Sequence, residues 1–333
     1  MKAIQYNLVW LIAVLALSGC SINRMAMRAV ADALTGAGSS TVFTGDDDPQ
    51  LVGEALPFAI KMYEALLSEA PDHRGLIITT GSLFVMYANA FIQGPAEFLP
   101  SFRYEERQAA RQRAKKLYLR GIEILMRGIE NEYPGFKKAS VEGGDLIPLL
   151  REMEKEDVPL LYWSAAGTLS AFSLDPFDFS LGKETPDCMA YIDRAYELDP
   201  GFNSGALDDF YVLAYASLPP AMGGDPSRVE FHFRRSLEKS GGKLAGPYVS
   251  YAQAVALPAQ DYDAFRSCLQ AAIDIDVDAA PENRLANIIS QRKARDLLNR
   301  AGDYFFLTED GELVTEAYQG FEVDLEYEGD YDS

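Results

Sequence analysis

The sequence predicts an all-α fold, a superhelical array of cryptic tetratricopeptide-like helical hairpins that ends in a C-terminal capping helix. Two observations carry this prediction. From Pro49 onward, apolar residues recur at three- and four-residue spacing almost throughout, which is the period of one face of an α-helix. A second pattern then repeats along the chain with the spacing of the second helix of a tetratricopeptide repeat. Because a single hairpin cannot bury its apolar face alone, neighbouring hairpins must stack.

The repeated pattern consists of a small or apolar residue, a residue four positions later, another three positions after that, and a position five beyond, which is a terminating Pro or Gly in four of the five copies. It first occurs as Ala59, Tyr63, Leu66 and Pro71, and then four more times: Ile122, Met126, Ile129, Pro134; Cys188, Ile192, Ala195, Pro200; Val229, Phe233, Ser236, Gly241; Ala264, Cys268, Ala271, Asp276. The small residue lets two helices approach closely, and Pro or Gly ends the helix. The alternative is an irregular all-α domain in which these spacings arise by chance.

Composition divides the chain into four segments: a lipoprotein signal peptide (residues 1–19), a lipidated N-terminus and tether (20–48), the helical domain (49–306) and an acidic C-terminal tail (307–333). Within the helical domain we expect an unusually long helix over Arg103–Glu132, an extra helix within residues 138–155 and the capping helix over Ala280–Gly302. Loops at Gln93–Phe102 and Asp175–Pro186 lengthen the first repeats beyond the standard period of about 34 residues.

Two cysteines, Cys188 and Cys268, lie inside helical patterns. The periplasm permits a disulfide, so this pairing is one interpretation. Cysteines in separate repeats are more often small core residues, and we expect that role here.

The first twenty residues have the pattern of a lipoprotein signal. Lys2 precedes an uncharged apolar stretch from Leu8 to Leu17, which is too short to span a bilayer but suits a signal-peptide core. Leu17-Ser18-Gly19-Cys20 follows and resembles the lipobox of bacterial lipoproteins. The resemblance implies that Cys20 becomes the acylated first residue and carries diacylglycerol and palmitate. In Gram-negative bacteria an Asp directly after the lipobox cysteine typically retains a lipoprotein at the inner membrane. This chain has Ser21 there, which favours the outer membrane, facing the periplasm. An ordinary signal peptide with an incidental cysteine is the alternative.

A net charge of −20 excludes a nucleic-acid partner, because phosphates require a basic footprint. It also excludes charge-driven binding to anionic lipid, so attachment to the bilayer must come from the acyl chains on Cys20.

Much of the acidity is local to the C-terminus. Ten acidic residues and no Lys or Arg lie between Thr308 and Ser333, and from Phe321 to Glu328 apolar and acidic residues alternate. A solvated tail is the first interpretation of this segment. An edge strand and a Ca²⁺-binding carboxylate cluster are the alternatives, although the ligand pattern of an EF-hand is absent.

A Pro- and Gly-rich corner links two helices at Ser217-Leu218-Pro219-Pro220-Ala221-Met222-Gly223-Gly224-Asp225. Together with the lipobox, the Gly75–Tyr87 helix and the Pro100–Gly128 region, this corner resembles the T-component (TatT) lipoproteins associated with tripartite ATP-independent periplasmic (TRAP) transporters. The resemblance implies an α-helical lipoprotein that contacts the TRAP solute-binding (P-type) protein and carries a hydrophobic channel, aided by homo-oligomerisation. It supplies no catalytic residues. Gly223, Gly224 and Asp225 are expected to be structural, with Asp225 capping the next helix.

The sequence carries no motif for catalysis, a cofactor or a metal. The two histidines, His73 and His232, are expected on the surface and in the core respectively. Asp208 and Asp209 are adjacent in a helix and therefore cannot face one site. We expect a non-enzymatic protein that assists uptake of a small hydrophobic or organic-acid ligand. The alternatives are a repeat scaffold for envelope or outer-membrane assembly and an enzyme whose site is assembled from isolated polar residues.

Candidate contact residues come from the middle of the chain, which is rich in aromatic residues. Most of these aromatics have helical spacing and belong in a core. Those in the two expected loops are less well explained by packing, and functional residues concentrate on such loops. The candidates for partner or ligand contact are therefore Phe98, Phe102, Phe177 and Phe179.

Overall fold

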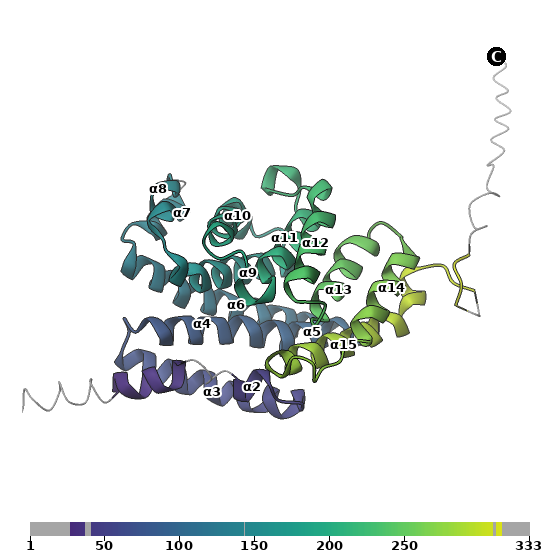
Figure 1. The fold of residues 1–333 in the computed structure, drawn as a ribbon, viewed down its shortest axis with the longest axis horizontal. Coiled ribbons are helices and arrows are strands. Elements are labelled where there is room, and N and C mark those ends of the chain that lie inside the picture. The colour runs from purple at the N-terminus through teal and green to yellow at the C-terminus, as the bar shows by residue number, and fades with distance from the viewer. Residues whose placement is uncertain (1–26, 37–40, 143, 309–310, 315–333) are drawn as a thin grey trace, which may run out of the picture.

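The computed structural model describes residues 27–36, 41–142, 144–308 and 311–314, and these residues form an all-α molecule (Figure 1). The predicted fold class is confirmed. Within this part of the chain the β contact is an isolated antiparallel bridge between Leu307 and Leu313. Cys20, the signal peptide and most of the acidic tail lie outside the described residues.

The longer helices are α3 (Pro49–Glu69), α4 (Arg74–Tyr87), α6 (Tyr104–Glu132), α9 (Val158–Leu174), α10 (Phe179–Leu198), α11 (Ala206–Ser217), α12 (Pro226–Lys239), α14 (Tyr262–Ile273) and α15 (Arg284–Asn299). The shorter ones are α2 (Thr41–Thr44), α5 (Gly94–Glu97), α7 (Phe136–Glu142), α8 (Ile147–Glu152), α13 (Gly246–Tyr251) and α16 (Ala301–Tyr304). Two π-helical turns, η1 (Ala88–Gln93) and η6 (Ala252–Ala256), extend α4 and α13. The 3₁₀ turns are η2 (Ser101–Arg103), η3 (Lys155–Asp157), η4 (Phe202–Ser204), η5 (Pro220–Met222) and η7 (Pro281–Asn283).

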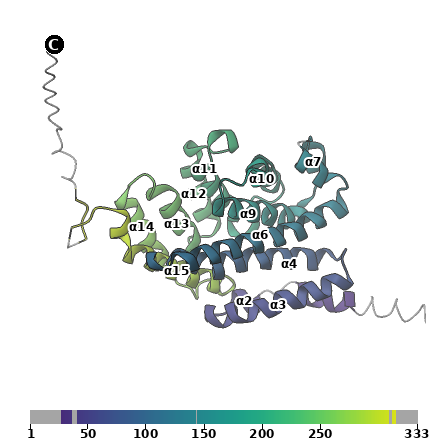
Figure 2. The same cartoon turned by 180° about the vertical axis from the view of Figure 1, so that it is seen from behind.

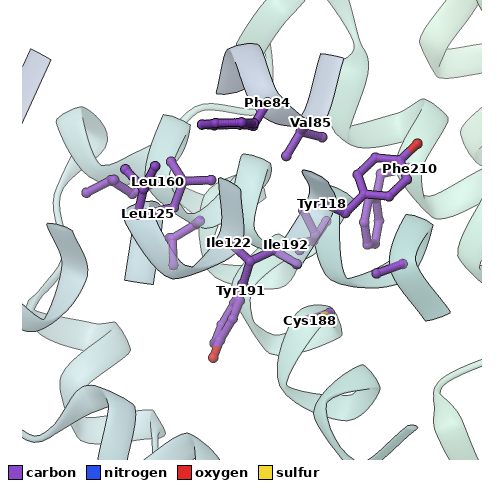
Figure 3. Packing of buried hydrophobic residues seen from close by; sticks show 14 of the residues in the cluster. Phe84, Val85, Tyr118, Ile122, Leu125, Leu160, Cys188, Tyr191, Ile192 and Phe210 are labelled. Carbon is purple, nitrogen blue, oxygen red and sulfur yellow. The ribbon is translucent and has the colours of Figure 1, made fainter. Parts of the chain in front are cut away.

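Helices of the first half stack in chain order, with α3 on α4, α4 on α6, α6 on α9 and α9 on α10. Seen from behind, α6 runs along the molecule between α4 and α9 (Figure 2). Close approach of α4 and α6 depends on two glycines, because a Cβ on Gly121 would lie 2.8 Å from the carbonyl oxygen of Gly81. Beside this contact, Phe84 and Val85 of α4 face Ile122 of α6 in the main hydrophobic core (Figure 3).

The second half continues as hairpins α11–α12 and α13–α14, followed by α15. A second core lies here, built around Phe265, Leu269 and Leu297. Helix α15 also returns to contact α2 and α3 (Figure 1), and Arg284 Nη1 donates to the carbonyl oxygen of Gly45 at 3.1 Å. The C-terminal end of the array is thereby joined to its N-terminal end.

The predicted repeat positions are buried in most of the helices. Ala59, Ile129, Ile192 and Ala195 are all buried. The last repeat is wrong by one residue, since Ala264 and Cys268 are half-buried whereas Phe265, Leu269 and Ala272 form the core. An aromatic at the next position offers more apolar area than Ala264 and so sets the buried face. The tetratricopeptide-like superhelix itself stays a prediction.

The two cysteines are free thiols. Cys188 is buried in the main core and Cys268 packs at the edge of the second core. The core role is confirmed for Cys188, and the alternative of a disulfide between the two is wrong.

Several boundaries differ from those expected. The long helix is confirmed as Tyr104–Glu132, but residues 138–155 contain most of α7 and all of α8 rather than one helix. The loop expected at Asp175–Pro186 is shorter, because α10 begins at Phe179 and includes Pro186. Proline cannot donate to the Gly182 carbonyl, and Thr185 Oγ1 donates to that carbonyl instead, at 2.9 Å. The segment Gln93–Phe102 is likewise mostly helical, through η1, α5 and η2.

One continuous helical stretch of the described residues, Arg74–Glu97, is long and apolar enough to cross a membrane. Within the fold, 61% of the most apolar 18-residue part of this stretch is buried. Its helix α4 packs between α3 and α6. These contacts make it a core helix of the array.

Candidate functional site

The loop between α9 and α10 is fastened to the N-terminal half of α6. Arg111 Nη2 donates to the Leu174 carbonyl at 3.1 Å. Lys115 Nζ contacts Asp175 Oδ2 at 2.7 Å and Asp178 Oδ2 at 2.8 Å. The Lys115 ammonium holds the pKa of the Asp178 carboxyl well below its usual range, and the hydrogen bonds to Asp175 and Asp178 raise the pKa of Lys115. The loop is therefore held on α6 by an ion pair that stays charged at neutral pH.

A hollow of about 390 Å³ lies where α5, α6 and the end of α9 meet. We call it the basic hollow; it is lined by Glu97, Arg107, Gln108, Arg111 and Leu174. Glu97 is neutralised by Lys293 of α15 at 3.2 Å. Arg107 lies over the Tyr104 ring. Among the described residues, no carboxylate forms an ion pair with Arg107 or Arg111. Two guanidinium groups thus give this hollow a positive charge in an otherwise acidic protein.

The four candidate phenylalanines flank the basic hollow in sequence, because Phe98 and Phe102 follow Glu97 and the other two follow Leu174. Three of them are exposed: Phe102 at 84%, Phe177 at 88% and Phe179 at 85%. Phe98 differs. It is half-buried at the second core, with the Arg300 guanidinium 5.5 Å from its ring centroid, and its carbonyl accepts a hydrogen bond from Arg300. Packing within the fold therefore explains the position of Phe98. It does not explain why Phe102, Phe177 and Phe179 are apolar, because their side chains are exposed.

Sequence reasoning missed Arg107 and Arg111. A signal was present, because residues 103–120 hold seven basic and two acidic residues within a chain of net charge −20. The spacing of Arg107 and Arg111 places both on one face of α6. What the sequence does not show is that α5 and the end of α9 border this face.

A second polar cluster lies buried between α10, α11 and α12. His232 Nδ1 lies 2.8 Å from Asp208 Oδ1, and Lys239 Nζ lies 2.5 Å from Asp208 Oδ2. Burial raises the pKa of Asp208, but hydrogen bonds from His232 and Lys239 outweigh it, and the net shift is downward. This cluster joins α11 to α12, and the His232 Nε2 and Ser236 Oγ atoms on the same helix are buried without a hydrogen-bond partner in the described structure. The expectation of a core role for His232 is confirmed.

Asp209 turns away from Asp208, as its position in the helix requires. Its Oδ2 accepts from Ser250 Oγ at 3.2 Å, whereas its Oδ1 is buried without a partner in the described structure. Burial raises the pKa of Asp209 to about 6. The two carboxylates therefore serve different helix contacts rather than one site.

His73 lies at the surface as expected, but its side chain is mostly covered. Its Nδ1 accepts from the Leu76 amide at 3.2 Å and caps α4, while its Nε2 lies 3.0 Å from Asp32 Oδ1. Only 11% of its side chain is exposed.

The corner at residues 217–225 is a structural element. Gly223 has φ +100°, and a Cβ on Gly224 would lie 1.7 Å from the Leu218 carbonyl oxygen. Asp225 Oδ1 accepts from the Ser227 amide at 3.1 Å and caps α12. A side chain at either glycine would strain or block this turn, so the corner is built to position α12.

The family model of the TRAP transporter T-component matches residues 45–305. The chain belongs to this family. The matched range contains the basic hollow and all four candidate phenylalanines. It excludes the lipobox and the acidic residues after Phe305, so Cys20 and the tail lie beyond what defines the family here.

The T-component also resembles a protein of Treponema pallidum (strain Nichols) described as uncharacterized. The two are 33% identical over 302 residues, covering 86% of this chain and 94% of the relative. Membership of this family connects the chain to TRAP transport and not to a class of enzymes. Within the described residues, no group of three or more His, Cys, Asp and Glu side chains is arranged to hold a metal ion.

Proposed function

We propose that this T-component is a non-enzymatic protein that binds a TRAP solute-binding protein and assists uptake of a small ligand. The observation that carries the proposal is the surface at the N-terminal half of α6. It combines the basic hollow with the exposed side chains of Phe102, Phe177 and Phe179. Exposed aromatics and arginines are the residue types enriched at protein interfaces.

The chemistry of this surface also limits the ligand class. Arg107 and Arg111 present donors that suit a carboxylate, and the phenylalanines present apolar area. A small organic acid or a hydrophobic molecule fits this combination. The proposal also includes passage of the ligand through a channel and assembly of a homo-oligomer. Both are what the resemblance to the TatT family implies.

Attachment to the membrane completes the proposed role. Acyl chains on Cys20 would hold the T-component at the outer membrane, facing the periplasm, where a solute-binding protein diffuses. Two or more acyl chains suffice for stable anchoring. The α-helical array itself then needs no contact with the bilayer.

Capture from membranes tests this function. Full-length, acylated protein with a C-terminal affinity tag is cross-linked in cells, purified in detergent and analysed by mass spectrometry. We expect a TRAP solute-binding protein with the wild type and its loss with the combined Phe102→Ser, Phe177→Ser and Phe179→Ser changes. Phe58→Ser is the matched control, because Phe58 is 76% exposed but lies on α3.

Recovery of envelope-assembly proteins without a solute-binding protein would contradict the proposed function. It would support the alternative of a scaffold for envelope or outer-membrane assembly. Equal capture by the triple variant and the wild type would place the binding surface elsewhere on the array.

A further inference from the structure

Positive charge is concentrated on the part of the T-component that borders the basic hollow. Among the residues described, Arg107 and Arg111 have no carboxylate partner, and the one acid in the hollow, Glu97, is already paired with Lys293. Unpaired guanidinium groups at the edge of a hollow favour a ligand that brings carboxylates. The exposed phenylalanines add an apolar requirement, so the preferred occupant is both acidic and apolar.

The chain itself contains a segment with these two properties. Phe321-Glu322-Val323-Asp324-Leu325-Glu326-Tyr327-Glu328 alternates apolar and acidic residues. In an extended chain, successive side chains point to opposite faces. Bound in that form, the segment would present four apolar side chains on one face and four carboxylates on the other.

The last described residues pack on the second core, which Phe98 also contacts. Tyr262 Oη donates to the Gly311 carbonyl at 3.0 Å, and the Tyr262 ring packs on Phe305 with centroids 5.1 Å apart. Phe305 and Phe98 contact the same second core, and Phe98 adjoins Glu97 of the basic hollow. Phe321 lies seven positions after Val314, and seven residues in extended form reach roughly 23 Å. The segment is thus tethered to the end of the array that carries Phe98, the neighbour of Glu97.

We propose that residues 321–328 bind in cis to the basic hollow. The acidic face of the segment contacts Arg107 and Arg111, and its apolar face contacts Phe177 and Phe179. This inference shares the hollow with the proposed function but needs no solute-binding protein, so each is tested without the other.

Peptide binding tests the inference. A fluorescent peptide of residues 315–333 is titrated by anisotropy against the chain ending at Val314 and against the full chain, both checked by circular dichroism for unchanged helicity. We expect saturable binding to the shortened chain that weakens with added salt, and binding at least about tenfold weaker to the full chain, whose own segment competes.

Charge reversal locates the site. Arg107→Glu with Arg111→Glu in the shortened chain should weaken the peptide by about tenfold or more. The matched control is Arg113→Glu with Lys116→Glu, since these exposed residues of α6 make the same charge change but do not line the hollow. A peptide in which Phe321, Val323, Leu325 and Tyr327 are serine keeps the charge and should also bind weakly.

Three results would overturn the inference: no saturable binding to the shortened chain, equal loss in the two charge-reversed variants, or equal affinity of the full and shortened chains. A full-length dimer that the deletion of residues 315–333 abolishes would also overturn it, because the segment would then bind a second copy.

Discussion

Lys115 on α6 and Asp178 at the start of α10 form an ion pair of 2.8 Å that ties two layers of the array together. Asp178 is also the N-cap of α10, and its Oδ1 accepts from the amides of Ser180 and Leu181. One carboxylate thus starts a helix and fixes that helix start to α6. Phe177 and Phe179, both exposed, are the neighbours of Asp178 in the sequence.

Lys115→Met should loosen this loop without unfolding the protein. The pair is partly exposed, so we expect a loss of only about 0.5–1 kcal/mol in the free energy of unfolding. Amide exchange at Ser180 and Leu181 should rise, because the cap is no longer held in place. Hydrogen exchange with mass spectrometry measures this. Lys116→Met, one residue along α6, should leave both amides unchanged, and equal exchange in the two variants would contradict the assigned role of the pair.

Gly121→Ala should destabilise the array strongly for so small a change. The added Cβ would lie 2.8 Å from the Gly81 carbonyl and 3.0 Å from Phe84 Cβ, so α4 and α6 must separate. We expect a cost of about 1–3 kcal/mol or more, measured by urea unfolding. Gly302→Ala is the control, because a Cβ there meets nothing within 4 Å. That change should be neutral or stabilise by up to about 1 kcal/mol. Two indistinguishable unfolding curves would mean that the α4–α6 contact is looser than described.

Asp209→Asn should change how stability depends on pH. The folded-state pKa of Asp209 is about 6, above the value of 3.8 for a free carboxyl, so folding favours the protonated form. Its contribution to stability is therefore lost as pH rises from about 4 through 6. At pH 7.5 the asparagine variant should be more stable than the wild type by about 1–3 kcal/mol, and at pH 4.5 this advantage should shrink. Asp296→Asn, on the exposed side of α15, should show no such trend. An advantage that is the same at both pH values would show that burial does not raise this pKa.

Cys20→Ser should prevent maturation of the lipoprotein. Without the thiol no diacylglycerol can be attached, and the precursor should keep its signal peptide and stay uncleaved. Intact-mass spectrometry of membrane fractions measures both. Finding no diacylglycerol on the mature wild-type protein would refute the lipobox interpretation.

Much of the fold could be predicted from local sequence pattern. The spacing of apolar residues and the helix terminators predict the start of α6 to within one residue. The prediction succeeds because a long amphipathic helix repeats its apolar pattern over many turns. The last repeat was misplaced by one residue because Phe265 and Ala264 both suit the pattern, and only packing shows which is buried. Pro186 predicts a loop because proline removes a helical hydrogen bond. The sequence does not show that the Thr185 hydroxyl replaces this hydrogen bond and lets the helix continue.

The site was predicted only in part. Exposure of Phe102, Phe177 and Phe179 agrees with the argument that core packing does not explain them, although their role stays a prediction. Phe98 was chosen by the same argument, and its contact with Arg300 depends on a helix about two hundred residues away. The basic hollow required knowing that α5 and the end of α9 border the same face of α6.

The affinity between the purified T-component and its TRAP solute-binding protein tests the central claim most directly. Isothermal titration with the solute-binding protein recovered by capture gives this value for the wild type, the Phe102, Phe177 and Phe179 triple serine variant, and Phe58→Ser. We expect saturable binding by the wild type and Phe58→Ser. The triple variant should bind at least about tenfold more weakly, since exposed aromatic anchors commonly contribute more than 1 kcal/mol each. Equal affinity in all three proteins, or no binding by the wild type, would contradict the account.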